Sequence, residues 1–151
     1  MPFVYIMKRI YLGADHAGYN LKEKIKKYLL ENGFVTDDLG TYSEKSVDYP
    51  EFGVKVAKEV VKDKRSLGII VCGTGVGISI AANKVKGARA ANLSDEKTAA
   101  LVHEHNDANI LAFGARVITF PKAKKLIEAF LKAKPNKVAR HKRRVKQLNK
   151  L

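Results

Sequence analysis

The chain has 151 residues, of which 46% are hydrophobic and 29% charged, which excludes a disordered chain and predicts one globular domain with a substantial core. No apolar run approaches the ~20 residues that span a bilayer, and no signal peptide is evident, so we expect no membrane partner. The net charge of +14 lies mostly after residue 121, where twelve Lys and Arg residues accompany a single glutamate, Glu128.

The first half of the chain alternates apolar strand patterns with amphipathic helical patterns. Residues 1–6 are predicted to be an extension before Met7, and Gly33 is a suitable helix stop. The predicted elements are a strand over 8–14, a helix over 19–31, a strand over 34–39 and, after a loop that ends at Tyr49-Pro50, a helix over 51–64.

The central stretch over 66–84 is S-L-G-I-I-V-C-G-T-G-V-G-I-S-I-A-A-N-K. A buried strand ends at Cys72, the three glycines Gly73, Gly75 and Gly77 follow, and a helix then begins. Glycines at this spacing bring backbone N–H groups close to a ligand, and a helix N-terminus favours an anion. The spacing G-x-G-x-G is a weak match to a dinucleotide fingerprint, so a phosphate, a sugar or an oxyanion fits equally well.

The second half of the chain continues the alternation. Ser94 is predicted to cap the fourth helix and Pro121 to begin the fifth. The predicted elements are a strand over 88–93, a helix over 94–104, a strand over 110–113, a helix from 121 and a basic C-terminal helix within 135–151.

Nearly all-apolar strands that alternate with helices predict an α/β fold, namely a three-layer α/β/α sandwich with a five-stranded parallel Rossmann-like sheet. The apolar stripe of the last helix, which consists of Val138, Val145 and Leu148, is thin. We therefore expect that helix to pack on a partner subunit.

The single cysteine excludes an internal disulfide and indicates a cytoplasmic protein.

Polar residues that follow the strands gather at one edge of a parallel sheet, where such folds bind their ligands. These residues are Asp15, His16, Cys72, Thr74 and Arg116. His105 and Asn106 end the fourth helix, so they belong to the opposite edge of their own subunit. They could reach the site only across a dimer interface.

Each candidate also has a purely structural explanation. A lone cysteine is more often a small buried hydrophobe than a reactive thiol. Asp15 could cap the first helix, His105 could cap the end of the fourth, and Tyr49 could be loop packing. His16 and His103 could be surface histidines.

The basic tail carries Arg140 and Arg144 four residues apart, the spacing of a two-armed phosphate clamp on one helix face. Such a pair also arises by chance in so basic a segment. A run of charged residues most often forms a solvent-exposed helix face. No aromatic residue follows Phe130, so the tail lacks a stacking platform for single strands, and we do not expect a nucleic-acid partner.

Six motifs together resemble the type B ribose-5-phosphate isomerases, a family that also includes the subunits of galactose-6-phosphate isomerase. They are G-A-D-H-A-G at 13–18, D-Y-P at 48–50, C-G-T-G-V-G-I-S-I-A-A-N-K at 72–84, H-N-D-A-N at 105–109, L-A-F-G-A-R at 111–116 and R-H-x-x-R-V at 140–145. The resemblance covers nearly the whole chain from Met7.

The resemblance implies an isomerase that interconverts ribose 5-phosphate and ribulose 5-phosphate without a metal or other cofactor, as a homodimer or a dimer of dimers. Cys72 would be the general base, because Ile78 stands where other members carry a glutamate. Thr74 would assist at the sugar oxygens. His105 would open the sugar ring from the partner subunit, with Asp15 helping across the site.

The resemblance also implies the substrate contacts. The loop N–H groups from Gly73 through Gly77 would stabilise the enediolate, as an oxyanion hole does. The phosphate-binding positions are matched by His16, Arg116, Arg140 and Arg144, and other substrate-contacting positions by Tyr49 and Asn106.

Three rival functions stand beside this one. The nearest is the same chemistry on a six-carbon sugar phosphate, such as allose or galactose 6-phosphate. The second is a non-catalytic nucleotide- or phosphate-binding module in which Cys72 only packs. The third is nucleic-acid binding through the basic tail, which would show a steep dependence of affinity on salt.

Overall fold

A fully parallel sheet forms the centre of the computed structural model, which describes residues 9–151. Its five strands lie in the order β2-β1-β3-β5-β4. They are β1 (Arg9–Ala14), β2 (Thr36–Asp38), β3 (Ser66–Cys72), β4 (Ala90–Asn92) and β5 (Ile110–Gly114). The expected extension over residues 1–6, and the first residue of the expected strand over 8–14, lie outside the described residues.

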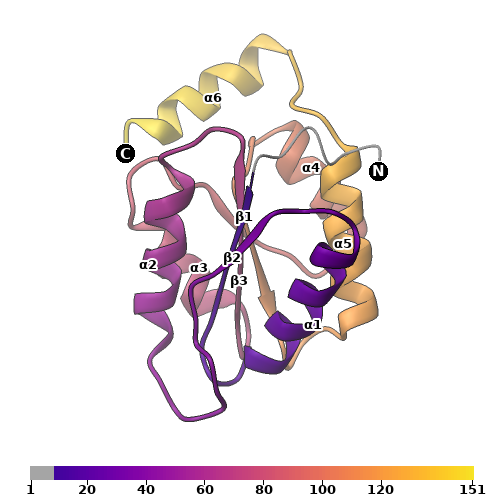
Figure 1. Cartoon of the computed structure of the whole chain (residues 1–151). Helices are drawn as coiled ribbons and strands as arrows, with labels where there is room; N and C mark the ends of the chain where they lie inside the picture. The colour runs from indigo at the N-terminus through magenta and orange to yellow at the C-terminus, as the bar shows by residue number, and fades with distance from the viewer. Residues whose placement is uncertain (1–8) are drawn as a thin grey trace.

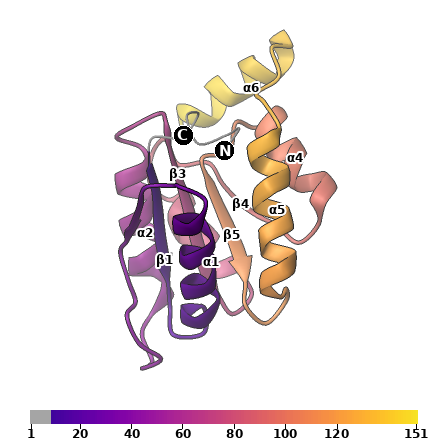
Figure 2. The ribbon, with the colours of Figure 1, turned by 45° about the vertical axis from the view of Figure 1, so that its right-hand side comes forward.

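Residues 9–151 form six helices, five of which cover the two faces of the sheet and complete the three-layer α/β/α sandwich that the sequence predicts. They are α1 (Tyr19–Glu31), α2 (Tyr49–Val60), α3 (Val76–Asn83), α4 (Glu96–Glu104), α5 (Phe120–Lys132) and α6 (Ala139–Asn149). Helices α2 and α3 cover one face, while α1, α4 and α5 cover the other (Figures 1 and 2). Helix α6 lies across the end of the sheet where the strands begin.

The core is divided by the sheet into two apolar clusters. The larger lies between the sheet and α1, α4 and α5, and the smaller lies between the sheet and α2 and α3. All seven residues of β3 are buried, because helices cover both faces of this central strand. That burial explains the continuous apolar run in its sequence.

The strand order creates a switch point between β1 and β3. From β1 the chain first moves outward to β2 and then returns to β3 on the other side of β1. The connections from the two strands therefore leave in opposite directions. Ligands of open α/β sheets bind outside the carboxyl ends of the strands at such a point. Here those ends lead into Asp15 and Cys72.

Several predicted boundaries are wrong by a few residues. Helix α2 begins at Tyr49, because Asp48 is extended and Pro50 fits the first helical turn, and it ends at Val60. Asp95, not Ser94, caps α4: its carboxylate accepts a hydrogen bond from the N–H of Thr98 at 2.8 Å. The second and fourth strands and the start of the fifth helix likewise differ from their predicted ranges by one or two residues, whereas α6 lies within its predicted range.

His103 is not the surface histidine that its position suggested. It is buried, its Nδ1 lies 2.7 Å from the carbonyl oxygen of Phe130, and its ring stacks on that of Phe130 with centroids 4.2 Å apart. A nitrogen this close to a carbonyl must carry the hydrogen, so His103 donates from Nδ1 and links α4 to α5.

Within residues 9–151, no helix combines the length and apolarity that crossing a bilayer requires.

Candidate functional site

Cys72 ends β3 at the middle of the carboxyl edge and is buried. The N–H of Gly75 donates to its Sγ at 3.2 Å. The segment after β5 fixes the same loop, because the N–H groups of Ala115 and Arg116 donate to the carbonyls of Cys72 and Gly73 at 2.9 and 3.0 Å. The sulfur is thus held in place beside a backbone donor, which suits a sulfur that carries negative charge.

Two of the loop glycines allow side chains from other elements to approach the backbone. A Cβ on Gly73 would lie 2.7 Å from Nη1 of Arg116, and a Cβ on Gly77 would lie 2.5 Å from the ring of Tyr49. A side chain at Gly77 would collide with the Tyr49 ring, whereas one at Gly73 would displace the end of the Arg116 side chain. The structure brings Arg116 and Tyr49, two of the predicted site residues, to the glycine loop.

The middle glycine serves the turn itself. Gly75 has a φ of +81°, in the region that disfavours side chains, and it caps the N-terminus of α3. A Cβ on Gly75 would also lie 2.5 Å from Oδ1 of Asn92, which ends β4. Beside it, Thr74 is exposed, and its Oγ1 accepts a hydrogen bond from the N–H of Val76 at 3.2 Å.

Asp15 follows β1 directly and is buried next to β3, the strand that ends at Cys72. Its N–H donates to the carbonyl of Val71 at 3.2 Å, and its Oδ1 accepts from the N–H of Gly18 at 3.0 Å. Gly18 is itself the N-cap of α1, so the carboxylate closes the turn into that helix without capping it. Asp15 therefore has a structural partner and also stands at the carboxyl edge.

His16 is half-buried at the same edge and is oriented by the loop over 40–48. The N–H of Val47 donates to its Nδ1 at 3.1 Å. The carbonyl oxygen of Val47 lies 3.2 Å from the same Nδ1, so both backbone groups of Val47 hold this edge of the ring. These contacts fix the position of the His16 ring whichever nitrogen carries the hydrogen.

A buried ion pair anchors the start of this loop. Lys22 has no exposed side-chain surface, and its Nζ lies 2.6 Å from Oδ2 of Asp38, which Lys26 approaches to 2.8 Å. Tyr42 donates from its hydroxyl to the carbonyl of Asp38 at 2.9 Å, and its ring centroid lies 5.7 Å from Nζ of Lys22. These contacts fix the loop that orients His16.

Four predicted site residues are not part of this group. His105 is the C-cap of α4 and Asn106 follows it, while Arg140 and Arg144 are exposed on α6. All four lie where the strands begin, at the opposite edge from Cys72, as the chain order indicated for His105 and Asn106. No single subunit brings the two sets together.

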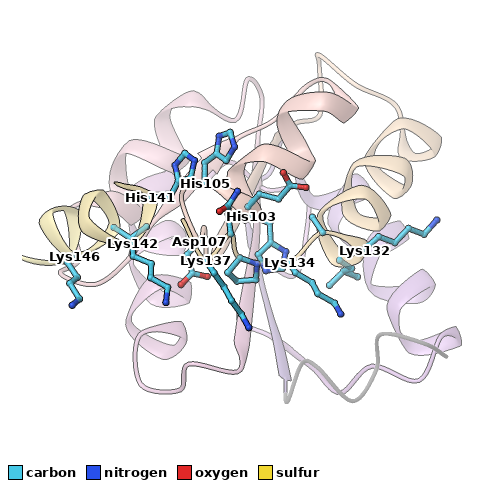
Figure 3. A pocket seen from close by; sticks show the side chains of 15 residues that line it. His103, His105, Asp107, Lys132, Lys134, Lys137, His141, Lys142 and Lys146 are labelled. Carbon is cyan, nitrogen blue, oxygen red and sulfur yellow. The ribbon is translucent and has the colours of Figure 1, made fainter. Parts of the chain in front are cut away.

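A cavity of about 970 Å³ lies beside this second set, between α6 and the ends of α4 and α5 (Figure 3). His103, His105 and His141 line it together with several lysines. His141 comes from α6 and stacks on His105. It stands within R-H-x-x-R-V but is not among the predicted site residues, and neither are Val47 and Asn92, because nothing local in the sequence shows what these residues contact.

The comparisons with known proteins agree with the resemblance. The profile of the Ribose/Galactose Isomerase family matches residues 10–148. Ribose-5-phosphate isomerase B of Escherichia coli strain K12 is 44% identical over 142 residues, which are 94% of this chain and 95% of that protein.

Solved structures match the fold closely. Ribose-5-phosphate isomerase B of Clostridium thermocellum superposes with a TM-score of 0.90 at 46% identity and covers 94% of this chain and 95% of its own. The enzyme of Mycoplasma genitalium, solved with bound ribulose 5-phosphate, superposes with a TM-score of 0.88 at 42% identity and covers 94% of each chain.

Proposed function

The chain belongs to the ribose/galactose isomerase family, and on that premise we propose that it interconverts ribose 5-phosphate and ribulose 5-phosphate with Cys72 as the general base. The assignment of Cys72 as the general base rests on one observation. The only thiol of the chain ends the central strand at the switch point, and a backbone N–H donates to its sulfur. General bases act from such fixed positions within reach of the proton they take.

The reaction begins with the closed sugar. Opening the ring breaks the bond between C1 and the ring oxygen, forms the C1 carbonyl and moves a proton from the C1 hydroxyl to the ring oxygen. A histidine can take and return such a proton at its two nitrogens. We assign this role to His105 of a second copy of the chain, with Asp15 helping from the first.

The Cys72 thiolate then takes the proton from C2, and negative charge develops on the C1 oxygen. Fixed N–H donors of the loop over 73–77 stabilise this enediolate, and Thr74 assists the proton movement between the two sugar oxygens. Return of the proton to C1 completes the ketose. Atoms and electrons balance without any further reactant.

The phosphate is remote from the reacting carbons and holds the open chain in place. His16 and Arg116 bind it from the carboxyl edge of the sheet that holds Cys72, which we call the thiol edge. Arg140 and Arg144 bind it from the partner's α6. Tyr49, whose ring lies against Gly77 of the glycine loop, and Asn106 contact the sugar. These assignments follow the positions that match the family's motifs.

This division of residues requires at least a homodimer in which the carboxyl edge of one copy meets the opposite edge of another. Val76 and Ile80 on α3, one turn apart beside the Cys72 loop, are 49% and 54% exposed, and Leu148 on α6 is 45% exposed. Apolar side chains exposed on both edges are what an interface between copies would cover. A thiolate base also suits a reducing compartment, so we place the protein in the cytoplasm.

Complementation tests the function and the shared site together. Cys72→Ala and His105→Ala proteins are each expected to be nearly inactive on ribose 5-phosphate. Mixed dimers contain one intact site of two, so refolding the variants together should restore about one quarter of wild-type turnover. Recovery would fail if both residues served the same subunit's site.

A matched control uses two variants from the same edge. Cys72→Ala mixed with Asp15→Ala leaves no intact site in any dimer, so no recovery is expected. A wild-type protein that turns over only six-carbon sugar phosphates would point to the nearest rival function. Retained turnover in Cys72→Ala would instead contradict the thiol mechanism.

A further inference from the structure

The ring of His105 stacks on one aromatic neighbour. His141 of α6 stacks on it with ring centroids 4.2 Å apart and planes within 6° (Figure 3). Among residues 9–151, neither imidazole has a hydrogen-bond partner for a ring nitrogen. Among the hydrogen bonds, ion pairs and ring contacts of the described residues, the stack is therefore the one that bears on the plane of the His105 ring.

His141 is also the one buried residue of α6. The rest of that helix is mostly exposed, and its second side-chain link to the body is Asn149, whose Oδ1 accepts from Nη1 of Arg89 at 2.8 Å. A buried aromatic ring within a strongly basic, exposed helix therefore joins α6 to the segment that carries His105.

Positive charge surrounds the stack. On α6 itself the cations nearest His141 are Arg140, Lys142, Arg144 and Lys146. The other charged groups around the cavity are Glu104 and Asp107 after α4, and Lys132, Lys134 and Lys137 between α5 and α6. Burial, followed by His105, Arg140 and Arg144, lowers the pKa of His141 below its ordinary value. The ring is thus neutral near pH 7.

We propose that His141 is a positioning residue for His105, and that its stacked ring holds the His105 imidazole in the plane in which it exchanges a proton with the closed sugar. This inference rests on the proposed function, because it gives His105 the ring-opening role. His141 itself touches no reacting atom. A group that must take a proton at one sugar oxygen and return it at another depends on a fixed orientation.

The stack also makes this orientation sensitive to pH. Protonation of His141 places a positive charge against the His105 ring and among the cations of α6, which is unfavourable. We therefore expect the ring-opening step to weaken as the pH falls through the range in which histidines gain their protons. A phenyl ring at position 141 would keep the stack and remove the repulsion.

The experiment compares His141→Ala and His141→Phe, with Lys142→Ala as the control on the same helix. Two rates are measured: net conversion of ribose 5-phosphate, and entry of solvent deuterium at C1 of ribulose 5-phosphate by NMR. Ribulose 5-phosphate has no free hydroxyl that closes a furanose ring, because its C5 oxygen carries the phosphate. Deuterium entry therefore reports proton transfer by Cys72 without ring opening.

His141→Ala is expected to lower kcat for ribose 5-phosphate roughly 10-fold while deuterium entry stays at the wild-type rate. His141→Phe should recover most of the lost conversion and move the acid limb of its pH profile to lower pH. Lys142→Ala should match the wild type in both assays.

Three results would overturn the inference. His141→Ala could convert ribose 5-phosphate at the wild-type rate, or lose both rates to the same extent, which would indicate a merely structural residue. His141→Phe could fail to recover activity. Failure of the proposed function is distinguishable, because then the wild type itself would show neither net conversion nor deuterium entry that depends on Cys72.

Discussion

The two edges of the sheet are built in different ways. At the carboxyl edge, backbone hydrogen bonds and close glycine contacts fix Cys72, its loop and the segment after β5. At the opposite edge, exposed cations stand on α6, which reaches the body through a histidine stack and one side-chain hydrogen bond. The groups at the carboxyl edge are brought together within one subunit. The proposed function requires His105 and the arginines at the opposite edge to act at the Cys72 site of another copy.

The largest expected effect is at the thiol edge. Cys72→Ala should lower turnover of ribose 5-phosphate roughly 10³-fold, because removal of a general base costs this order of rate. The fold should persist, since the change removes only the sulfur atom and keeps Cβ in place. Steady-state kinetics with and without EDTA measures the loss, and the wild-type rate should be insensitive to EDTA. A Cys72→Ala enzyme with near wild-type turnover would contradict the mechanism.

The next effect is on stability and concerns the ion pair that anchors the loop over 40–48. Asp38→Asn removes one of the two carboxylates that pair with the fully buried Lys22, the other being Glu23 at 2.9 Å. It should lower the free energy of unfolding by about 2 kcal/mol, less than the cost of a buried charge left with no partner. Asp37→Asn is the matched control, because Asp37 pairs with a substantially exposed Arg9 at 2.7 Å. Its cost should be about 0.5 kcal/mol. Equal costs would show that burial of the pair is unimportant.

The same pair predicts a pH dependence. Burial alone would raise the pKa of Asp38, but hydrogen bonds from Lys22, Lys26 and the N–H of Gly40 outweigh it and lower the pKa below its ordinary value. The stabilisation is therefore present above about pH 4, the ordinary carboxyl range, and is lost as the pH falls through the lower native pKa. Urea unfolding between neutral and acid pH should show a steeper loss in the wild type than in Asp38→Asn.

A smaller effect comes from comparing alanine substitutions at two glycines, which separates the energetic cost of backbone strain from that of side-chain crowding. Gly75 at the thiol edge and Gly87 at the opposite edge have φ values of +81° and +91°. A Cβ at Gly75 meets backbone atoms of β5 at 2.8 Å, whereas at Gly87 the nearest atom lies 3.4 Å away. Gly87→Ala should cost about 1 kcal/mol from φ alone, and Gly75→Ala more than about 2 kcal/mol. Thermal unfolding of both variants measures the difference.

The smallest effect concerns the exposed cations of α6. Arg144→Ala should raise KM for ribose 5-phosphate about tenfold, as the loss of one charge-assisted hydrogen bond does, and leave stability unchanged. The neighbouring Arg143→Ala removes the same charge from a position outside the predicted clamp, so its KM should stay near the wild-type value. Equal rises in KM would reduce the role of Arg144 to general electrostatic attraction.

Much of the thiol edge could be predicted from the sequence, because strand ends in a parallel sheet share an edge and the residues after them are adjacent along the chain. Cys72, Asp15 and Arg116 were placed in this way. Residues that meet the site through non-local contacts were missed, as Asn92 and His141 show. Ser94 was chosen as a cap over Asp95 since both residue types cap helices, and only the backbone path separates them.

The sequence by itself determined the α/β class, the strand that leads to the only thiol and the basic character of the C-terminal helix, because these depend on local periodicity and composition. Tertiary structure decided the strand order, the close contacts at the glycines and the stack of His105 on His141. Those features depend on which distant segments meet, and many pairings satisfy the same local pattern. Packing selects one of them, and that choice left His105 and the arginines of α6 on the edge away from Cys72.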